Sequence, residues 1–435
     1  MKGFQVGVLI FFGVFVLLGV LIFSGALKLP EKGGGGEQAA VGTIRIWGTV
    51  SKKSMNTAIA FLNSKNESLK IVYQEKDPRT FDDDLLNAFA FGGLPDMFLM
   101  SQEHIIAYED KVVNIPFTNF PERTYSDTYI RSAEIFKRGA GFIGFPIFSD
   151  PLVMYYNQDL MEAAGYVAPP KYWKDLFEYV PKLTKKNEAL QVLTSGVALG
   201  EFSNVKNAKE IFMAMNLQLN NPVVVAIEGG RYESVLDVQS DVSGRPAVQS
   251  LNFYNEFSNP VNTVYSWNKS KPSSENAFIA GDLAIYFGLA SEARTIALKN
   301  PNLNFDVSAI PQVKELPTRM TYADVYALAI PKTSPNAQMA LSVAADLANG
   351  ANTLALVAPT GFAPMRRDLI ASGNTDKWNV VFYDSALNSR SWIDPDDEAT
   401  TELFRTMVED VISGLSNADD AVSDANSELR RIINK

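Results

Sequence analysis

The sequence GFPIFSDPLVMYYNQDL, Gly144–Leu160, decides the fold that we predict. Its first glycine and proline predict a turn, and a loop carrying one carboxylate, Asp150, is expected to follow. The apolar run 152–156 is long enough for one buried strand. Asn157 is then expected to cap a short helix over 158–164, which Gly165 ends. A further helix is predicted over 173–183, after two prolines interrupt the chain.

Strands and helices alternate in the part of the chain that precedes this segment. Strands are predicted over 43–48, 69–73 and 95–100, and helices over 55–64 and 81–91. The alternation predicts a parallel sheet with helices on its faces, which is an α/β architecture. Open sheets of this kind bind ligands beyond the carboxyl ends of their strands. The candidate binding residues are therefore Trp47, Gly48 and Thr49 after the first strand, and Ser101 and Gln102 after the third. For Trp47, a place in the core is an equally good interpretation.

The composition excludes several classes of function. The chain has 435 residues, a formal net charge of −10 and no cysteine. An acidic chain without a basic stripe argues against nucleic acid as a partner. Disulfides and thiol catalysis are excluded, and one histidine, His104, cannot form a multi-histidine metal site. We expect no metal and no cofactor, and a lone histidine is more typical of a surface or a helix start than of a catalyst.

The N-terminal segment has the length and composition of a membrane span. Residues 4–27 include no charged side chain, and at roughly 1.5 Å per residue they can cross a hydrocarbon core of about 30 Å. We expect residues 1–29 to be an uncleaved anchor with the body of the protein outside the cytoplasm. Cleavage near Ser24-Gly25-Ala26, which would give a secreted protein, stays an alternative. Residues 30–42 contain four consecutive glycines and are interpreted as a flexible linker.

Two motifs match functional signatures by spelling only. The run GAGFIG, 139–144, matches the dinucleotide fingerprint, but Pro146 follows where a helix should begin, so we interpret the run as a hairpin turn. The acidic run 394–398 looks like a calcium loop but has Ala399 where glycine is required. We interpret it as a helix start, with Asp394 as the N-cap and Pro395 as the first helical residue.

Several motifs occur in the order that is typical of one protein family. They are Gly144, Pro146, Tyr156, Asn157, Asp159 and Leu160, then Gly165, Pro169, Pro170 and Trp173, the turn 93–96, and the segments 274–288 and 361–367. Together they resemble the extracellular solute-binding proteins of ABC importers, family 1, the maltose-binding-protein-like group. Tyr172 departs from the pattern, because the family usually has Thr or Ser there as a helix cap.

The resemblance implies a periplasmic-binding-protein fold, which is α/β with two lobes and a ligand cleft between them. We expect residues 43–135 and 311–358 to form lobe 1, and residues 136–310 and 359–435 to form lobe 2 with the C-terminal helices. Closure of the lobes about a hinge would capture the ligand. The resemblance, with the polar or aromatic character of the side chains, adds these candidate binding residues: Asp150, Glu201, Phe202, Asn204, Tyr322, Asp324 and Trp392. Gly288 is added because backbone N–H groups at the end of its predicted strand could face a ligand.

The implied function is that of a membrane-anchored, non-enzymatic substrate-binding component, which delivers a small polar solute to the permease subunits of an ABC transporter. A saccharide is the favoured ligand, because aromatic rings suit sugar faces while carboxylates and amides suit hydroxyl groups. Two alternatives stay open. One is a secreted carbohydrate-active hydrolase that uses two of the carboxylates Asp150, Glu201 and Asp324. The other is a ligand sensor on the same fold.

Overall fold

The structure, a computed structural model, describes residues 42–65, 69–240 and 244–435. The predicted anchor and all but the last residue of the predicted linker lie outside the described residues. Residues 43–435 form one compact unit. Within the described ranges no single helix is long and apolar enough to span a membrane, and one pair bent by 81°, Ala337–Leu347 with Gly350–Val357, meets both criteria together.

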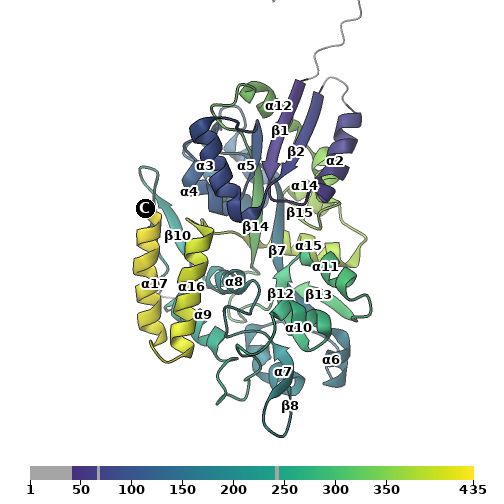
Figure 1. Ribbon diagram of the computed structural model, residues 1–435, viewed down its shortest axis with the longest axis vertical. Coiled ribbons are helices and arrows are strands. Elements are labelled where there is room, and N and C mark those ends of the chain that lie inside the picture. The colour runs from purple at the N-terminus through teal and green to yellow at the C-terminus, as the bar shows by residue number, and fades with distance from the viewer. Residues whose placement is uncertain (1–41, 66–68, 241–243) are drawn as a thin grey trace, which may run out of the picture. The chain divides into compact units, whose positions relative to one another are not determined.

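A single large sheet runs through this unit (Figure 1). Its strands lie in the order β2-β1-β3-β14-β7-β12-β9-β8, while β13 and β15 pair with β7 and β16 pairs with β14. The bounds are β1 Gly42–Gly48, β2 Leu69–Glu75, β3 Met97–Met100, β7 Phe145–Asn157, β8 Lys185–Lys186, β9 Val192–Val197, β12 Leu283–Leu289, β13 Phe305–Ala309, β14 Thr321–Ala329, β15 Ala363–Pro364 and β16 Ser389–Arg390.

The sheet as a whole is mixed: the parallel pairing predicted for the first strands is confirmed for β1 and β3, while β7 and β14, which come later in the chain, add antiparallel pairs. β1 pairs with β3 in parallel, as β12 does with β9. β7 and β14 are antiparallel to each other, β7 is antiparallel to β12, and β14 is antiparallel to β3. Parallel neighbours need a long crossover connection, and the helices α2 and α3 lie between β1 and β3 in the chain; the short strand β6, Gly141–Phe142, which precedes β7, belongs to a separate small sheet.

β7 links the two halves of the sheet. Its first part pairs with β14 and β15, and its second part pairs with β12 and β13. The predicted loop around Asp150 is therefore wrong, because Asp150 lies inside this strand, directly opposite Asp324. Pro146 lacks an N–H group and is accommodated at a register shift of the β7–β14 ladder, where the regular pairing is interrupted.

Helices flank the sheet in both halves (Figure 1). Those predicted over 81–91 and 158–164 are confirmed to within one residue. The bounds are α2 Lys52–Ser64, α3 Phe81–Phe91, α4 Ile105–Tyr108, α5 Glu122–Thr128, α6 Gln158–Ala163, α7 Leu176–Leu183, α8 Ala208–Gln218, α9 Pro246–Asn255, α10 Ser274–Ala280, α11 Glu292–Lys299, α12 Ala337–Leu347, α13 Gly350–Val357, α14 Arg367–Ala371, α15 Lys377–Leu387, α16 Asp397–Ile412 and α17 Ala418–Ile433. Short 3₁₀ turns cover Pro78–Thr80, Gln102–His104, Arg131–Phe136 and Trp173–Asp175.

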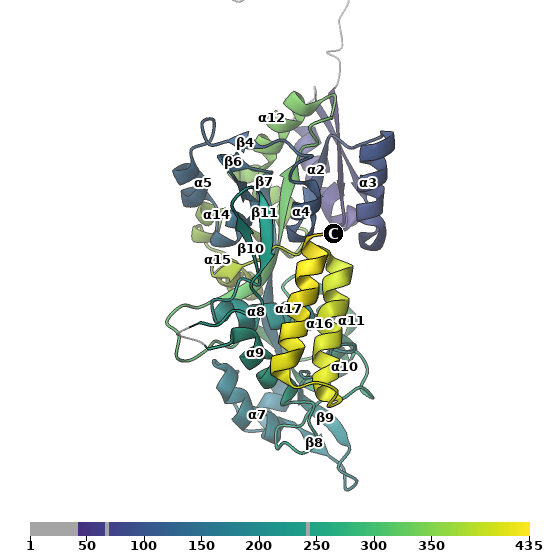
Figure 2. The same cartoon turned by 90° about the vertical axis from the view of Figure 1, so that its left-hand side faces the viewer.

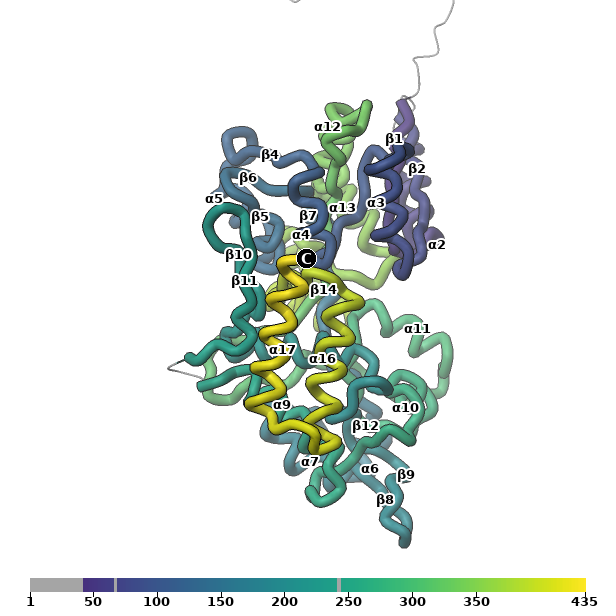
Figure 3. Tube along the Cα trace, turned by 60° about the vertical axis from the view of Figure 1, so that its left-hand side comes forward, coloured from purple at the N-terminus to yellow at the C-terminus, as the bar shows by residue number. Residues whose placement is uncertain are grey.

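Two small sheets stand beside the large one. β4, Ile115–Pro116, pairs with β6, and β6 pairs with β5, Lys137–Arg138, so the hairpin interpretation of the run 139–144 is confirmed. A second hairpin, β10 Val224–Ile227 with β11 Arg231–Ser234, follows α8. Figures 2 and 3 both show this hairpin next to the region of β4, β5 and β6.

The helix at the acidic run 394–398 starts later than predicted. α16 begins at Asp397, and its cap is Asp396, whose carboxylate accepts a hydrogen bond from the N–H of Ala399 at 2.9 Å. Asp394 as the cap is therefore wrong, and Pro395 stands outside the helix. Asp394 is buried and is engaged elsewhere, as described below. α16 then packs along α17 (Figure 2).

The departure at Tyr172 is compensated locally. The carboxylate of Asp175 accepts hydrogen bonds from the N–H groups of Lys171 at 3.1 Å and of Tyr172 at 2.9 Å. An acid three residues into a helix performs this half of a capping box, so the helical segment still begins at Trp173.

Candidate functional site

Polar and aromatic side chains share one face of the strand pair β7–β14. Asp150 stands opposite Asp324, and Phe148 stands opposite Tyr326. Directly opposed residues of an antiparallel pair point to the same side of the sheet, and residues two apart do so along each strand. The face therefore carries two carboxylates beside Tyr322 and Tyr326, at the place where β7 passes from one half of the sheet to the other.

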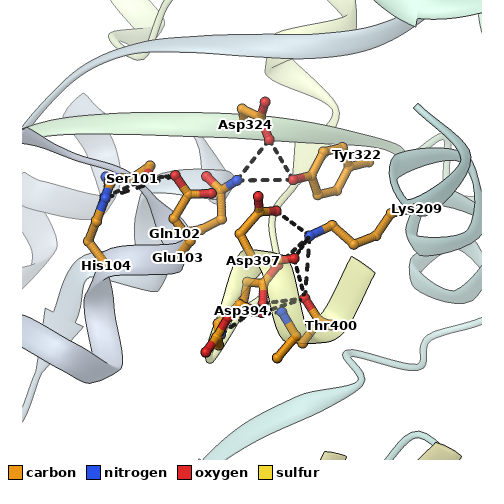
Figure 4. A network of polar contacts seen from close by, with 12 residues as sticks. Ser101, Gln102, Glu103, His104, Lys209, Tyr322, Asp324, Asp394, Asp397 and Thr400 are labelled. Atoms are coloured by element: carbon orange, nitrogen blue, oxygen red, sulfur yellow. Dashed lines mark hydrogen bonds and ion pairs between the residues drawn. The ribbon is translucent and has the colours of Figure 1, made fainter. Parts of the chain in front are cut away.

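Gln102 links the 3₁₀ turn after β3 to this face. Its amide nitrogen donates to the Asp324 carboxylate at 2.8 Å and to the Tyr322 hydroxyl at 3.1 Å. Its amide oxygen accepts from the N–H of Val325 at 3.0 Å. The Tyr322 hydroxyl also donates to Asp324 at 2.5 Å. Three of the predicted residues thus form one hydrogen-bonded cluster, although they come from segments more than 200 positions apart (Figure 4).

Ser101 joins the same turn to two neighbours. Its hydroxyl bonds the Glu103 carboxylate at 2.9 Å and the Nδ1 atom of His104 at 2.6 Å. His104 is buried, packs edge-on against Phe81, and its pKa is lowered because burial disfavours the charged imidazole. His104 therefore positions the turn that carries Ser101, Gln102 and Glu103.

A buried lysine approaches from the opposite side, at the start of α8. The Lys209 ammonium donates to the carboxylate of Asp394 at 2.8 Å, to the carboxylate of Asp397, and to the hydroxyl of Thr400 at 3.3 Å. Its side chain is only 7% exposed, and that of Asp394 is 3% exposed. Burial by itself lowers the pKa of Lys209, but the carboxylates of Asp394 and Asp397 together raise it by more than burial lowers it. The pKa of Lys209 therefore lies above its usual value. Figure 4 shows this second cluster beside the first.

Negative charge is in excess where the two clusters meet. Burial, reinforced by the charges of Asp397 and Asp324, raises the pKa of Glu103 to about 8. Burial also raises the pKa of Glu210 to about 7, although Lys209 opposes it. The pKa of Asp324 is raised by burial and partly lowered again by its bonds from Tyr322 and Gln102. Several carboxyl groups thus share one ammonium group, which favours their neutral, hydrogen-bonding forms.

Asp150 is held from the β12 side. Its carboxylate accepts a hydrogen bond from the N–H of Ser291 at 2.9 Å, and burial raises its pKa well above the usual range. Gly288 lies nearby in β12, where an added Cβ would meet the rings of Tyr286 and Tyr155 at 2.6 and 3.0 Å. Glycine at this position allows the close packing of these two tyrosines.

The remaining predicted residues have other partners. Trp47 packs under the Lys76 ammonium, 3.7 Å from its ring centroid, Thr49 is half-buried, and Gly48 has no room for a Cβ beside Leu99. Asn204 bonds the carbonyl groups of Asn268 and Lys271, at 2.9 and 3.0 Å. The last three are buried: Glu201 beside Lys269 and Glu409, Phe202 in the core, and Trp392 edge-on against Phe404.

Sequence reasoning missed five charged members of the site: Glu103, Lys209, Glu210, Asp394 and Asp397. One signal was present, because Lys209 and Glu210 are the only charged residues of the otherwise apolar segment 208–215. The run 394–398 was interpreted only as a helix start.

Among the residues that the structure describes, no group of three or more His, Cys, Asp or Glu side chains converges in a way that could hold a metal ion.

Two surface hollows lie elsewhere. One of about 790 Å³ is lined by residues of α16 and α17, and one of about 470 Å³ has Trp173 and Phe253 among its lining residues. None of the predicted binding residues lines either hollow.

Comparison with known proteins gives a consistent result. The sequence profile of the bacterial extracellular solute-binding proteins matches residues 57–381. Similar solved structures include an ABC transporter solute-binding protein from Thermotoga lettingae bound with α-D-tagatose, at 19% identity and a TM-score of 0.66, covering 90% of this chain and 100% of that one. The sugar-binding protein MalE from Xanthomonas citri matches at 19% and 0.69, covering 90% and 97%. A substrate-binding protein from Listeria monocytogenes in complex with cycloalternan matches at 15% and 0.68, covering 89% and 98%. These likenesses confirm an α/β periplasmic-binding-protein fold like that of MalE.

Proposed function

The chain belongs to the family of bacterial extracellular solute-binding proteins, and from this premise we propose that it captures a saccharide and delivers it to the permease of an ABC transporter. The main support for the proposal is the polar site on β14. Gln102, from one half of the sheet, bonds Asp324 in this strand, and α8, which carries Lys209 and belongs to the other half, packs against the same strand. Structures of the same fold are described as bound with tagatose, cycloalternan and mannotriose.

The proposed mechanism is closure about the strands shared by both halves. β7 and β14 continue through the site, so a change in their twist would move the Gln102 turn relative to α8. A ligand that contacts both sides stabilises the closed arrangement by its differential affinity for it. The raised pKa values of Glu103 and Glu210 favour protonation of these carboxyl groups near neutral pH, and a protonated carboxyl group can both donate and accept hydrogen bonds, as sugar hydroxyl groups do.

Aromatic rings next to the carboxyl groups support a sugar rather than a linear polar solute. Tyr326 shares the face of Asp324 and stacks on Phe362 with ring centroids 5.6 Å apart. Phe148 packs against both rings. An apolar ring face flanked by carboxyl and amide groups fits the two-sided chemistry of a pyranose.

The hydrolase alternative is less favoured. The family consists of binding components rather than enzymes. Of the three candidate acids, Glu201 stands apart, next to Lys269 and Glu409, while Asp150 and Asp324 are directly opposed in one strand ladder and already hold hydrogen bonds. A sensor on the same fold would bind its ligand with the same residues.

We further propose the anchor over residues 1–29, which would hold the protein at the outer face of the membrane near its permease. The two lobes are proposed with the boundaries given above. Three sets of contacts argue for moving three of these boundaries. Gln312, placed in lobe 1, pairs with Tyr172 of lobe 2, and Met365, placed in lobe 2, accepts a hydrogen bond from the N–H of Ile130 in lobe 1. β6, placed in lobe 2 together with β5, pairs both with β5 and with β4 of lobe 1, so we assign Arg138 to lobe 1.

The test is titration calorimetry of the purified protein with α-D-tagatose, mannotriose, maltotetraose and, as negative probes, glutamate and a tripeptide. We expect heat with at least one saccharide, recovery of that saccharide unchanged by chromatography, and affinity reduced at least tenfold in Gln102→Ala. The matched control is Gln191→Ala, which removes an exposed glutamine bonded only to Asn187. Consumption of the saccharide would move the assignment to a hydrolase, and binding of the negative probes alone would refute the saccharide.

A further inference from the structure

The β10–β11 hairpin extends from the half of the structure that contains α8. Its strands pair in regular antiparallel register, with Tyr232 opposite Ala226, and Gly229 and Gly230 form its turn with positive φ angles of 81° and 70°. The base is fastened to α17, where the Ser234 hydroxyl bonds the Asn426 side chain at 2.6 Å. The hairpin is therefore a regular two-stranded arm whose base is bonded to α17.

The arm contacts an ion pair, Glu109–Arg138, on the other half. The Tyr232 hydroxyl donates a hydrogen bond to the carboxylate of Glu109, which follows α4. The same carboxylate oxygen accepts from Nε of Arg138 in β5, and the guanidinium group lies 5.6 Å from the Tyr232 ring centroid. Figures 2 and 3 show the arm beside this region.

The Glu109–Arg138 pair is also held by contacts that do not involve the arm. Arg138 donates to the carbonyl groups of Ile135 and Lys137, so its orientation is set within its own segment. Next to Glu109, the segment 111–113 is tied to the end of β14 by the bond from the N–H of Val113 to the carbonyl of Ile330, at 2.8 Å. Glu109 and Arg138 are 20% and 15% exposed, so the contact is shielded from water while it is made. Hydrogen bonds to charged groups are the stronger ones.

We propose that the hairpin Val224–Ser234 is a latch, whose Tyr232 fastens one lobe to the Glu109–Arg138 pair of the other and holds the closed arrangement even without ligand. None of the predicted binding residues takes part in this contact. The role of the latch in retaining ligand rests on the proposed function, but the latch itself does not.

The latch predicts that removing the Tyr232 hydroxyl group lowers the ratio of closed to open molecules about tenfold. A hydrogen bond to a charged group contributes enough to change the ratio of closed to open molecules about tenfold. Tyr232→Phe removes that hydroxyl and keeps the ring beside Arg138, and the Glu109–Arg138 ion pair stays intact. The matched control is Tyr179→Phe, because the Tyr179 hydroxyl bonds the carbonyl of Ala168 at 3.2 Å, within one half.

The experiment exploits the absence of cysteine from the chain. Spin labels at Lys53→Cys and Glu188→Cys, both exposed, report the separation of α2 from the β8–β9 hairpin in the ligand-free full chain. We expect a short-distance population in the parent chain and in Tyr179→Phe, and a ratio of short to long distances about tenfold lower in Tyr232→Phe. Equal distributions in Tyr232→Phe and the parent, or a parent with no short-distance population, would overturn the latch.

A saccharide-binding measurement tests the proposed function independently of the latch. If no saccharide binds but the Tyr232→Phe distribution shifts, the transport function fails and the latch stands. If maltotetraose binds and the distributions are equal, the latch fails and the transport function stands.

Discussion

Replacement of Lys209 by methionine tests the buried charge network. The Lys209 side chain is 7% exposed and its main partner, Asp394, is 3% exposed. Removing one member of a buried ion pair leaves the other charge uncompensated and costs about 3–5 kcal/mol. Methionine fills a similar volume, so a cavity adds little to that cost. We expect Lys209→Met to lower the free energy of unfolding by this amount at pH 7.

The assay is urea unfolding of the purified protein followed by tryptophan fluorescence. The matched control is Lys174→Met, whose ion pair with Glu315 is exposed, at 69% and 57%. Exposed pairs contribute about 0–1 kcal/mol, so the control should unfold close to the parent. The double variant Lys209→Met/Asp394→Asn should recover part of the loss, because no buried charge is then left without a partner.

The loss should also depend on pH in a defined direction. Burial raises the pKa of Asp394 and Lys209 opposes this effect, so removing the lysine raises that pKa further. A carboxyl group whose pKa is higher in the folded state contributes stability that is present below the unfolded pKa and is lost as the pH rises through the folded pKa. The deficit of Lys209→Met should therefore shrink from pH 8 to pH 5. A variant as stable as Lys174→Met at pH 7, or a deficit that grows at pH 5, would refute the reasoning.

Three further predictions concern single side chains. Gly48→Ala places a Cβ 2.7 Å from Leu99 Cδ1, and this overpacking should cost about 1–3 kcal/mol in thermal unfolding, whereas Gly350→Ala, whose nearest contact is 3.7 Å, should not destabilise. Asp396→Ala removes the cap of α16 and should cost about 0.5–2 kcal/mol by urea unfolding; unchanged stability would contradict the capping. Glu103→Gln should flatten the decline of stability between about pH 5 and 8, because the pKa of Glu103 is raised to about 8 and its proton is lost only on unfolding in that range. Parallel pH profiles of the parent and Glu103→Gln would contradict the raised pKa.

Part of the site was predictable from position along the chain. Ser101 and Gln102 follow a strand end, and strand ends of an open sheet gather at one edge. Tyr322 and Asp324 came from a family resemblance, and the structure brings them to Gln102. Their function as ligand contacts stays a prediction that the calorimetry tests.

The rest of the site was not predictable in this way. Lys209 and Asp394 are 185 positions apart, and nothing in either local sequence indicates that they pair. The acidic run 394–398 has an ordinary local explanation as a helix start, which hid the buried role of Asp394. Likewise, Tyr232 lies in a short hairpin with no motif, and its contact with Glu109 depends on how two distant segments pack.

The sequence by itself determined the alternation of strands and helices, the ends of helices at residues such as Gly165 with its φ of +83°, and the membership of a family. These depend on periodicity and on local backbone chemistry, which act over a few residues. Only the tertiary structure decided that Asp150 lies inside a continuous strand and that Asp394 and Asp397 both pair with Lys209. The physical reason is that strand pairing, burial and the protonation of a carboxyl group depend on neighbours that the fold brings from elsewhere in the chain.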